Sequence, residues 1–119
     1  MNDLQVIAKI LVVIRESQKT GAVNFDLISE KSLGVTEKER DDFIITLFHS
    51  GLIEGIITSE DIDNAPDLIL WNLSKPRVTL EGIKFMNNDS DFKKAIKEIV
   101  KQIPLTLLGA LCSSYLSEV

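Results

Sequence analysis

Hydrophobic residues near the start of the chain recur with the 3.6-residue period of an α-helix. The main apolar stripe consists of Leu4, Ile7, Ile10, Leu11 and Ile14. The pattern predicts a helix that begins at Asp3, whose carboxylate can cap the first turn, and ends near Gln18. Val6, Val12 and Val13 add apolar side chains outside this stripe. We therefore expect other parts of the protein to cover the helix on two sides.

A short helix and a longer helix are predicted next, with a tight turn between them. The short helix is capped by Asp26 or Asn24 and ends at a glycine, which can adopt the left-handed conformation. The longer helix starts with a capping box formed by Thr36 and Glu39 and continues to about Ser50. This order of short helix, tight turn and longer helix predicts a helix-turn-helix.

The next segment has the pattern of a β-hairpin. Residues 52–58 are expected to form a strand, residues 59–67 an acidic loop, and residues 68–73 a returning strand. Gly55 should point inward in the first strand and leave space for a neighbouring side chain. Residues 74–77 are expected to connect the hairpin to the next helix. A helix-turn-helix followed by a hairpin is the plan of a winged-helix domain.

Two more helices are predicted after the hairpin, followed by a strongly apolar tail. Thr79 should cap a helix that ends at about Asn87. Asp89 or Ser90 should cap the next helix, and Pro104 must end or kink it because proline cannot donate to the helical ladder. The predicted fold is therefore mostly α with a small β-hairpin. It comprises a winged helix-turn-helix domain (1–88) and a C-terminal helical extension (89–119) that packs on this domain or on a second subunit.

Composition is that of an ordinary globular protein. The 119 residues are 45% apolar and 26% charged, and the single cysteine cannot form an internal disulfide. Apolar runs are too short to span a bilayer, and the N-terminus lacks the pattern of a signal peptide, so we expect a cytoplasmic protein. Net charge is −5, and its distribution is uneven. Residues 1–74 carry 13 acidic and 6 basic side chains, whereas residues 75–119 carry 5 acidic and 7 basic ones.

This charge distribution disfavours nucleic acid as the partner of the helix-turn-helix. DNA binding requires a basic face that neutralises phosphates. The recognition-helix positions carry a net negative charge, and they are Glu37, Lys38, Arg40, Asp41 and Asp42. The wing carries four carboxylates, which belong to Glu60, Asp61, Asp63 and Asp67. We therefore favour a scaffold or protein-binding role for the winged helix over direct DNA binding through it.

Two surfaces of the C-terminal part are further candidate sites. A basic stripe follows one helix face and consists of Lys93, Lys94, Lys97 and Lys101. It could meet nucleic acid or an acidic partner, although most amphipathic helices simply show such a face to solvent. The apolar tail predicts self-association through Leu105, Leu107, Leu108, Leu111 and Tyr115. The alternative is that the tail folds back over the first helix of its own chain. Membrane contact is not expected, because the tail lacks a basic polar face.

Catalytic and metal chemistry is not expected. His49 is the only histidine and Cys112 the only cysteine, which excludes a His cluster or a thiolate zinc site within one chain. The acidic loop lacks the order of a calcium loop, and no phosphate-binding glycine motif is present. We predict a non-enzymatic protein without a cofactor.

Several short motifs resemble those of the YjcQ-like proteins. They are G-V-T at 34–36, G-L-I at 51–53, V-T-L-E-G-I-K-F-M-N-N-D-S at 78–90 and K-K-A-I-K-E-I at 93–99. The resemblance spans residues 1 to about 103 and implies a small winged-helix protein of the kind encoded by prophages of Gram-positive bacteria. It carries no established activity, and the apolar tail after Pro104 departs from the family pattern.

The prediction from the sequence is a non-enzymatic interaction or scaffold module, which forms a homodimer through its C-terminal helices and binds an unidentified protein partner. The alternative is a DNA-binding transcriptional regulator that uses the lysine stripe or a groove created by the dimer.

Overall fold

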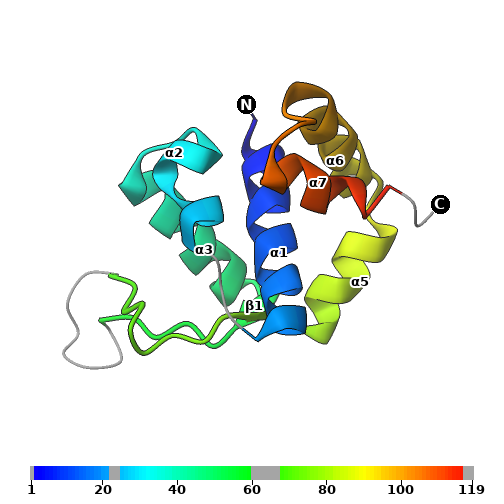
Figure 1. Ribbon diagram of the computed structural model, residues 1–119. Helices are drawn as coiled ribbons and strands as arrows, with labels where there is room; N and C mark the ends of the chain where they lie inside the picture. Colours follow the sequence, from blue (N-terminus) through cyan, green and yellow to red (C-terminus); the bar gives the residue numbers. More distant parts are fainter. Residues whose placement is uncertain (1, 22–24, 60–67, 117–119) are drawn as a thin grey trace.

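The computed structural model describes residues 2–21, 25–59 and 68–116 of the chain. Short helical segments and one small antiparallel sheet make up the described part (Figure 1). In chain order, the elements are α1 (Asp3–Thr20), the 3-10 helix η1 (Phe25–Ile28), α2 (Glu30–Leu33), α3 (Glu37–His49), β1 (Ile53–Glu54), β2 (Arg77–Val78), α5 (Leu80–Asn88), α6 (Ser90–Gln102) and α7 (Leu107–Ser113). The fold is mostly α with a small hairpin, as the sequence predicts.

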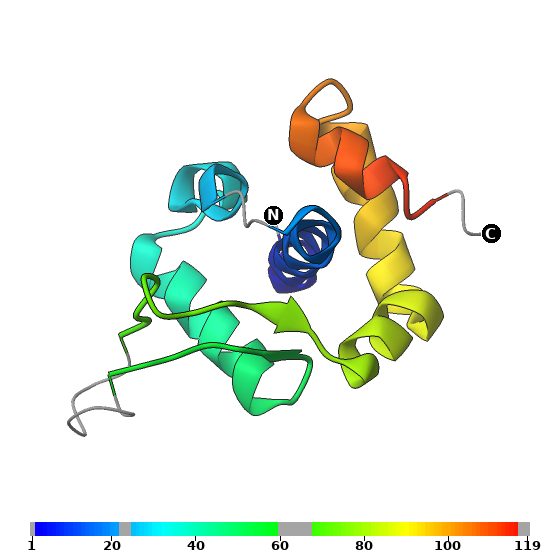
Figure 2. The ribbon, with the colours of Figure 1, turned by 60° about the horizontal axis from the view of Figure 1, so that its bottom comes forward.

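Helix α1 is the centre of the molecule. Figures 1 and 2 show α2 and α3 on one side of it and α5, α6 and α7 on the other. Residues 10–14 of α1 are all buried, and so are Val6 and Ala8. This burial confirms the prediction that the helix is covered on more than one side, because its apolar side chains point in several directions.

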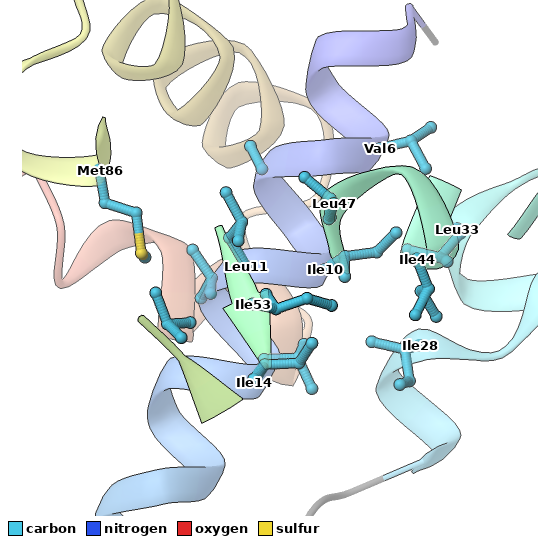
Figure 3. Close-up of a cluster of buried hydrophobic side chains, with 14 of the residues drawn as sticks. Val6, Ile10, Leu11, Ile14, Ile28, Leu33, Ile44, Leu47, Ile53 and Met86 are labelled. Atoms are coloured by element: carbon cyan, nitrogen blue, oxygen red, sulfur yellow. The ribbon is translucent and has the colours of Figure 1, made fainter. Parts of the chain in front are cut away.

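One hydrophobic core connects these elements. Figure 3 shows side chains from the helix-turn-helix and from the first strand gathered against α1. The labelled members are Val6, Ile10, Leu11, Ile14, Ile28, Leu33, Ile44, Leu47, Ile53 and Met86. Phe92, Ile96 and Ile99 of α6 belong to the same core, as do Leu108 and Cys112 of α7. The C-terminal helices therefore pack on α1 of their own chain.

The first two helix caps differ from those expected. Asn2, not Asp3, caps α1, because the Gln5 backbone N–H donates to Asn2 Oδ1 at 2.9 Å. The residue whose side chain accepts a hydrogen bond from the Gln5 N–H lies three residues earlier, at Asn2. Asp3 therefore lies inside the first turn of the helix. Ser29 caps α2 in place of Asp26 or Asn24, because residues 25–28 already form a 3-10 turn.

The helix-turn-helix is confirmed in its local details. Thr36 Oγ1 accepts from the Glu39 N–H at 3.1 Å, and Glu39 Oε1 accepts from the Thr36 N–H at 3.0 Å. These two bonds form the predicted capping box at the start of α3. Gly34 ends α2 at a φ of 73°, in the left-handed region that the sequence predicted for it.

Removal of this cap has a measurable expected cost. A Thr36→Ala variant should lower the free energy of unfolding by about 1 kcal/mol, since the Glu39 N–H loses its acceptor. Urea unfolding followed by circular dichroism measures the change. Ser90→Ala is the matched control, because Ser90 is exposed and Asp89 provides the cap at that helix. An equal loss in both variants would show that the capping box does not stabilise α3.

The wing differs from the predicted hairpin. The expected returning strand over 68–73 contains only one isolated bridge, between Thr58 and Ile69, and then turns outward. The Ser74 hydroxyl causes this turn, because it accepts from the Ile57 N–H and donates to the Leu70 carbonyl, at 2.9 Å each. Regular pairing resumes in β2, Arg77–Val78, where the sequence analysis placed a connector and the start of a helix.

Gly55 is the second reason for the irregular wing. Its φ is 83°, and an added Cβ would collide with the Lys75 carbonyl oxygen. The left-handed residue interrupts the alternation of the strand, so Ile53 and Ile56 are both buried whereas Ile57 is only half-buried. Gly55 allows close approach of the opposite backbone; it does not leave space for a side chain.

Hydrogen bonds fix the end of the wing to the core. Gln18 Oε1 of α1 accepts from the Val78 N–H at 2.7 Å, and the Thr79 hydroxyl donates to the Gly51 carbonyl at 2.6 Å. Thr79 also caps α5, as predicted, by accepting from the Gly82 N–H. The hairpin therefore has a defined position relative to α1 and α3.

Candidate functional site

The start of α3 is the position at which a winged-helix protein would read DNA. Glu37, Lys38 and Asp42 are exposed there, whereas Arg40 and Asp41 are partly buried. Glu39 is exposed as well, and its hydrogen bonds to Thr36 hold the pKa of its carboxyl below the ordinary value. The described face is therefore acidic at neutral pH.

Arg40 is occupied by its own chain. Its guanidinium lies 3.0 Å from Asp41, 3.7 Å from Glu30 and 4.0 Å from Glu37, measured to the carboxylate oxygens. The guanidinium carbon also lies 5.7 Å from the centre of the Trp71 ring, which the outward turn of the wing brings over α3. Only 14% of the arginine side chain is exposed. The only arginine of α3 thus has its charge balanced and its donors directed at carboxylates, where a DNA reader would direct them at phosphate.

Neutralising these carboxylates should create DNA affinity. We expect the variant Glu30→Gln, Glu37→Gln, Asp41→Asn to bind duplex DNA more tightly than the wild type at low salt, because it frees Arg40 and removes three repulsive charges. Fluorescence anisotropy of labelled DNA measures the change in affinity. The slope of log K against log salt concentration should become more negative by about 0.9 for each phosphate contacted.

A matched control changes the same charge elsewhere. In Glu81→Gln, Asp91→Asn, Glu98→Gln, the neutralised carboxylates lie on α5 and α6, away from α3. Equal gains in the two triple variants would mean that the gain in affinity does not depend on the release of Arg40.

The wing carboxylates predicted to repel DNA are Glu60, Asp61, Asp63 and Asp67, and they lie outside the residues that the structure describes.

The basic stripe lies on a different side of the protein. Lys93, Lys94, Lys97 and Lys101 are all exposed on α6, which packs on α1 opposite α3 (Figures 1 and 2). Lys101 Nζ lies 3.5 Å from Glu98, and Lys94 borders a shallow hollow with Asp91 and Glu98. Acidic side chains thus interrupt the stripe. The structure does not bring these lysines together with α3.

The C-terminal tail divides into buried and exposed leucines. Leu108 is buried within its own chain and Leu111 is half-buried, in keeping with the alternative that the tail folds back over the first helix. By contrast, Leu105 is 99% exposed and Leu107 is 59% exposed. The hydroxyl of Tyr115 donates to Glu16 Oε1 of α1 at 2.9 Å and fastens the end of the tail. Burial and this carboxylate both raise the pKa of Tyr115.

An exposed apolar surface remains around Leu107. A hollow of about 220 Å³ lies between α1, η1 and α7, and its apolar walls are Val13, Leu27, Leu107 and Leu111. Leu105 projects into solvent two residues before this rim. Leu105 and Leu107 are the predicted self-association positions that the fold leaves most exposed, and we call these two leucines and the hollow the C-terminal apolar surface.

A buried lysine lies beneath α7, and the sequence analysis did not single it out. Lys9 of α1 is only 2% exposed, and its Nζ donates to the Ser32 carbonyl of α2 at 3.4 Å. Burial lowers its pKa, and the nearby Cys112 opposes this shift. The burial of Lys9 could have been inferred from the sequence, because this lysine lies within a helix whose other side chains are apolar in several directions.

The described residues offer no reactive thiol or metal centre. Cys112 is fully buried, and burial raises the pKa of its thiol to about 12, although the Lys9 ammonium opposes this effect. His49 is exposed at the end of α3, and α3 and α7 lie on opposite sides of α1 (Figures 1 and 2). Within the described ranges, no cluster of three or more His, Cys, Asp or Glu side chains could hold a metal ion. In the same ranges, no helix has both the length and the apolar character needed to cross a bilayer.

A family model described as YjcQ protein matches residues 8–104. This segment begins within α1 and ends just before α7, so it contains the helix-turn-helix, the wing, α5 and α6. No curated protein and no solved structure matches the chain.

Proposed function

This chain belongs to the YjcQ protein family, and we propose that it acts as a non-enzymatic protein-interaction module that self-associates through its C-terminal apolar surface. The observation that carries the proposal is the exposure of Leu105, at 99%, beside the exposed Leu107 and an apolar hollow. Single exposed leucines are common on protein surfaces, but a cluster beside an apolar hollow is typical of a contact site.

The helix-turn-helix supports an interaction role over DNA binding. Its exposed residues are mainly acidic, and Arg40 is paired with Glu30, Glu37 and Asp41. Phosphate would have to displace three carboxylates and the Trp71 ring to reach this guanidinium. Such a face suits a protein partner with basic or hydrogen-bonding groups better than it suits the DNA backbone.

The self-association is tested by mutating the exposed leucines. We expect the wild type to scatter light with the mass of a dimer and the Leu105→Asp, Leu107→Asp variant to scatter as a monomer. Both side chains are exposed within one chain, so the variant should keep its fold and its circular dichroism spectrum.

The matched control is Leu73→Asp, which changes a leucine that is 60% exposed in the wing. It should leave the dimer intact. A wild type that is monomeric at every concentration, or a dimer that persists in the double variant, contradicts the proposal.

The second candidate function is that of a DNA-binding regulator that uses α6. The exposure of Lys93 and Lys97 favours it. In that case the double variant Lys93→Glu, Lys97→Glu should bind DNA more weakly. The slope of log K against log salt concentration should become shallower by roughly 0.9 for each phosphate that the variant no longer neutralises. The prophage origin and the cytoplasmic location remain predictions of the resemblance and of the composition.

A further inference from the structure

Helix α7 is joined to the rest of the protein by the short turn at residues 103–106. We propose that α7 is an exchangeable helix, which leaves α1 of its own chain and docks at the same place on a second copy. Two copies that exchange this helix form a dimer. This inference rests on the proposed function, since it specifies how the C-terminal segment self-associates.

The turn at residues 103–106 is closed by local hydrogen bonds. The Thr106 hydroxyl donates to the Ile103 carbonyl at 2.8 Å, and the Gly109 N–H donates to that hydroxyl at 2.9 Å. A Cβ on Gly109 would collide with the Ile103 carbonyl oxygen. Opening the turn breaks these local interactions, whereas docking on a second copy restores the packing of α7 against α1 and α6. The cost of exchange is therefore concentrated in the turn.

Two buried apolar side chains hold the docked helix, and the half-buried Leu111 packs beside them. Leu108 and Cys112 are its buried apolar residues, and Tyr115 adds one hydrogen bond to Glu16. Cys112 also lies near enough to the Lys9 ammonium to interact with it electrostatically, whereas the hydrogen bond of this ammonium goes to the Ser32 carbonyl of α2. Undocking of α7 therefore breaks no hydrogen bond of Lys9 that the described residues show. Undocking of α7 should therefore need less free energy than unfolding of the whole core.

The exposed leucines indicate that α7 of a second copy occupies the site on α1 that α7 leaves. Leu105 lies in the turn, and Leu107 begins the helix that moves. In an exchanged dimer, the two opened turns pass each other between the copies, where these leucines can pack together. Exchange thus explains their exposure in the single chain, and the receiving surface already has the shape of α7.

The proposal is tested with a Gly109→Ala variant. The added methyl group collides with Ile103 only in the closed turn, so the variant should shift the equilibrium toward the exchanged dimer. Light scattering at matched concentrations should show a higher dimer fraction than in the wild type. The control is Gly21→Ala, which strains the left-handed end of α1 at a φ of 85° but meets no atom within 4 Å. It therefore destabilises the protein away from the turn, and its dimer fraction should be unchanged.

The outcomes separate exchange from simple surface contact. If Gly109→Ala leaves the dimer fraction unchanged while Leu105→Asp, Leu107→Asp abolishes the dimer, the proposed function stands and exchange is wrong. If all variants and the wild type are monomers, both are wrong.

Cys112 provides a second measurement that does not depend on the variant folding well. It is the only thiol and is a buried residue of α7 itself, so an aromatic disulfide reagent reaches it only when α7 leaves the core. In the wild type, the labelling rate at low urea should depend weakly on urea and exceed the rate expected from global unfolding. Leu108→Ala should speed labelling by roughly tenfold or more, because it removes a buried anchor. Labelling that follows global unfolding at all urea concentrations would overturn the proposal.

Discussion

A Lys9→Met variant is expected to be more stable than the wild type, by about 1 to 3 kcal/mol in the free energy of unfolding. Lys9 is 2% exposed between α1, α2 and α7, and its ammonium has one long hydrogen bond. Methionine fills similar space without a charge to desolvate. Urea unfolding at neutral pH measures the difference, and Lys38→Met, at an exposed lysine of α3, is the control that should change little.

The stability gain should depend on pH in a defined direction. Burial lowers the pKa of Lys9 in the folded protein, so the folded state binds fewer protons than the unfolded state between that lowered pKa and 10.5. The wild type is therefore stabilised by Lys9 deprotonation as pH rises through this window. Tyr115 titrates in both proteins, whereas Cys112 loses the opposing Lys9 ammonium in the variant, so the difference between variant and wild type reports Lys9 together with its interaction with Cys112. The advantage of Lys9→Met should shrink between pH 7 and the upper end of the window. A variant that is less stable than the wild type at pH 7 would contradict this account.

A Phe92→Ala variant should show the largest loss of stability, about 3 to 5 kcal/mol. Phe92 is 1% exposed in α6, and its ring packs edge-to-face on Phe85 with centroids 5.6 Å apart. Its removal leaves a cavity between α5, α6 and α1. Calorimetry measures the loss, and Lys93→Ala, at the exposed neighbouring position, is the control.

The form of this transition is as informative as its midpoint. Buried residues of α6 and α1 belong to one core, so Phe92→Ala should unfold in a single transition at lower temperature. Two separate transitions would instead mean that residues 1–88 and 89–119 unfold as independent units.

The features that could be predicted from the sequence depend on neighbouring residues. The capping box of Thr36 and Glu39 and the left-handed Gly34 are set by interactions within four residues. The wing could not be predicted in the same way, because its register depends on Ser74 bonding Ile57, which lies 17 residues away. The segment 68–73 is apolar apart from Asn72 and therefore has the pattern of a strand, although the Ser74 hydroxyl ends it in a turn.

In the candidate site, too, features set by neighbouring residues could be predicted and features set by distant contacts could not. The exposure of Lys93 and Lys97 follows from helical periodicity and could be predicted. The pairing of Arg40 with Glu30 and Trp71 could not, since it requires the packing of α2, α3 and the wing together. The burial of Lys9 likewise depends on where α7 docks, which is set by tertiary packing more than by the local pattern.

The central claim is that this winged-helix surface serves protein contact and not phosphate binding. The most direct test is fluorescence anisotropy of labelled duplex DNA with the wild-type protein at about 50 and 200 mM salt, the range over which phosphate contacts change affinity. We predict no binding at either concentration, because Arg40 is paired with carboxylates and the exposed part of α3 is acidic. Tight binding at the lower salt concentration that weakens steeply at the higher one would contradict the claim.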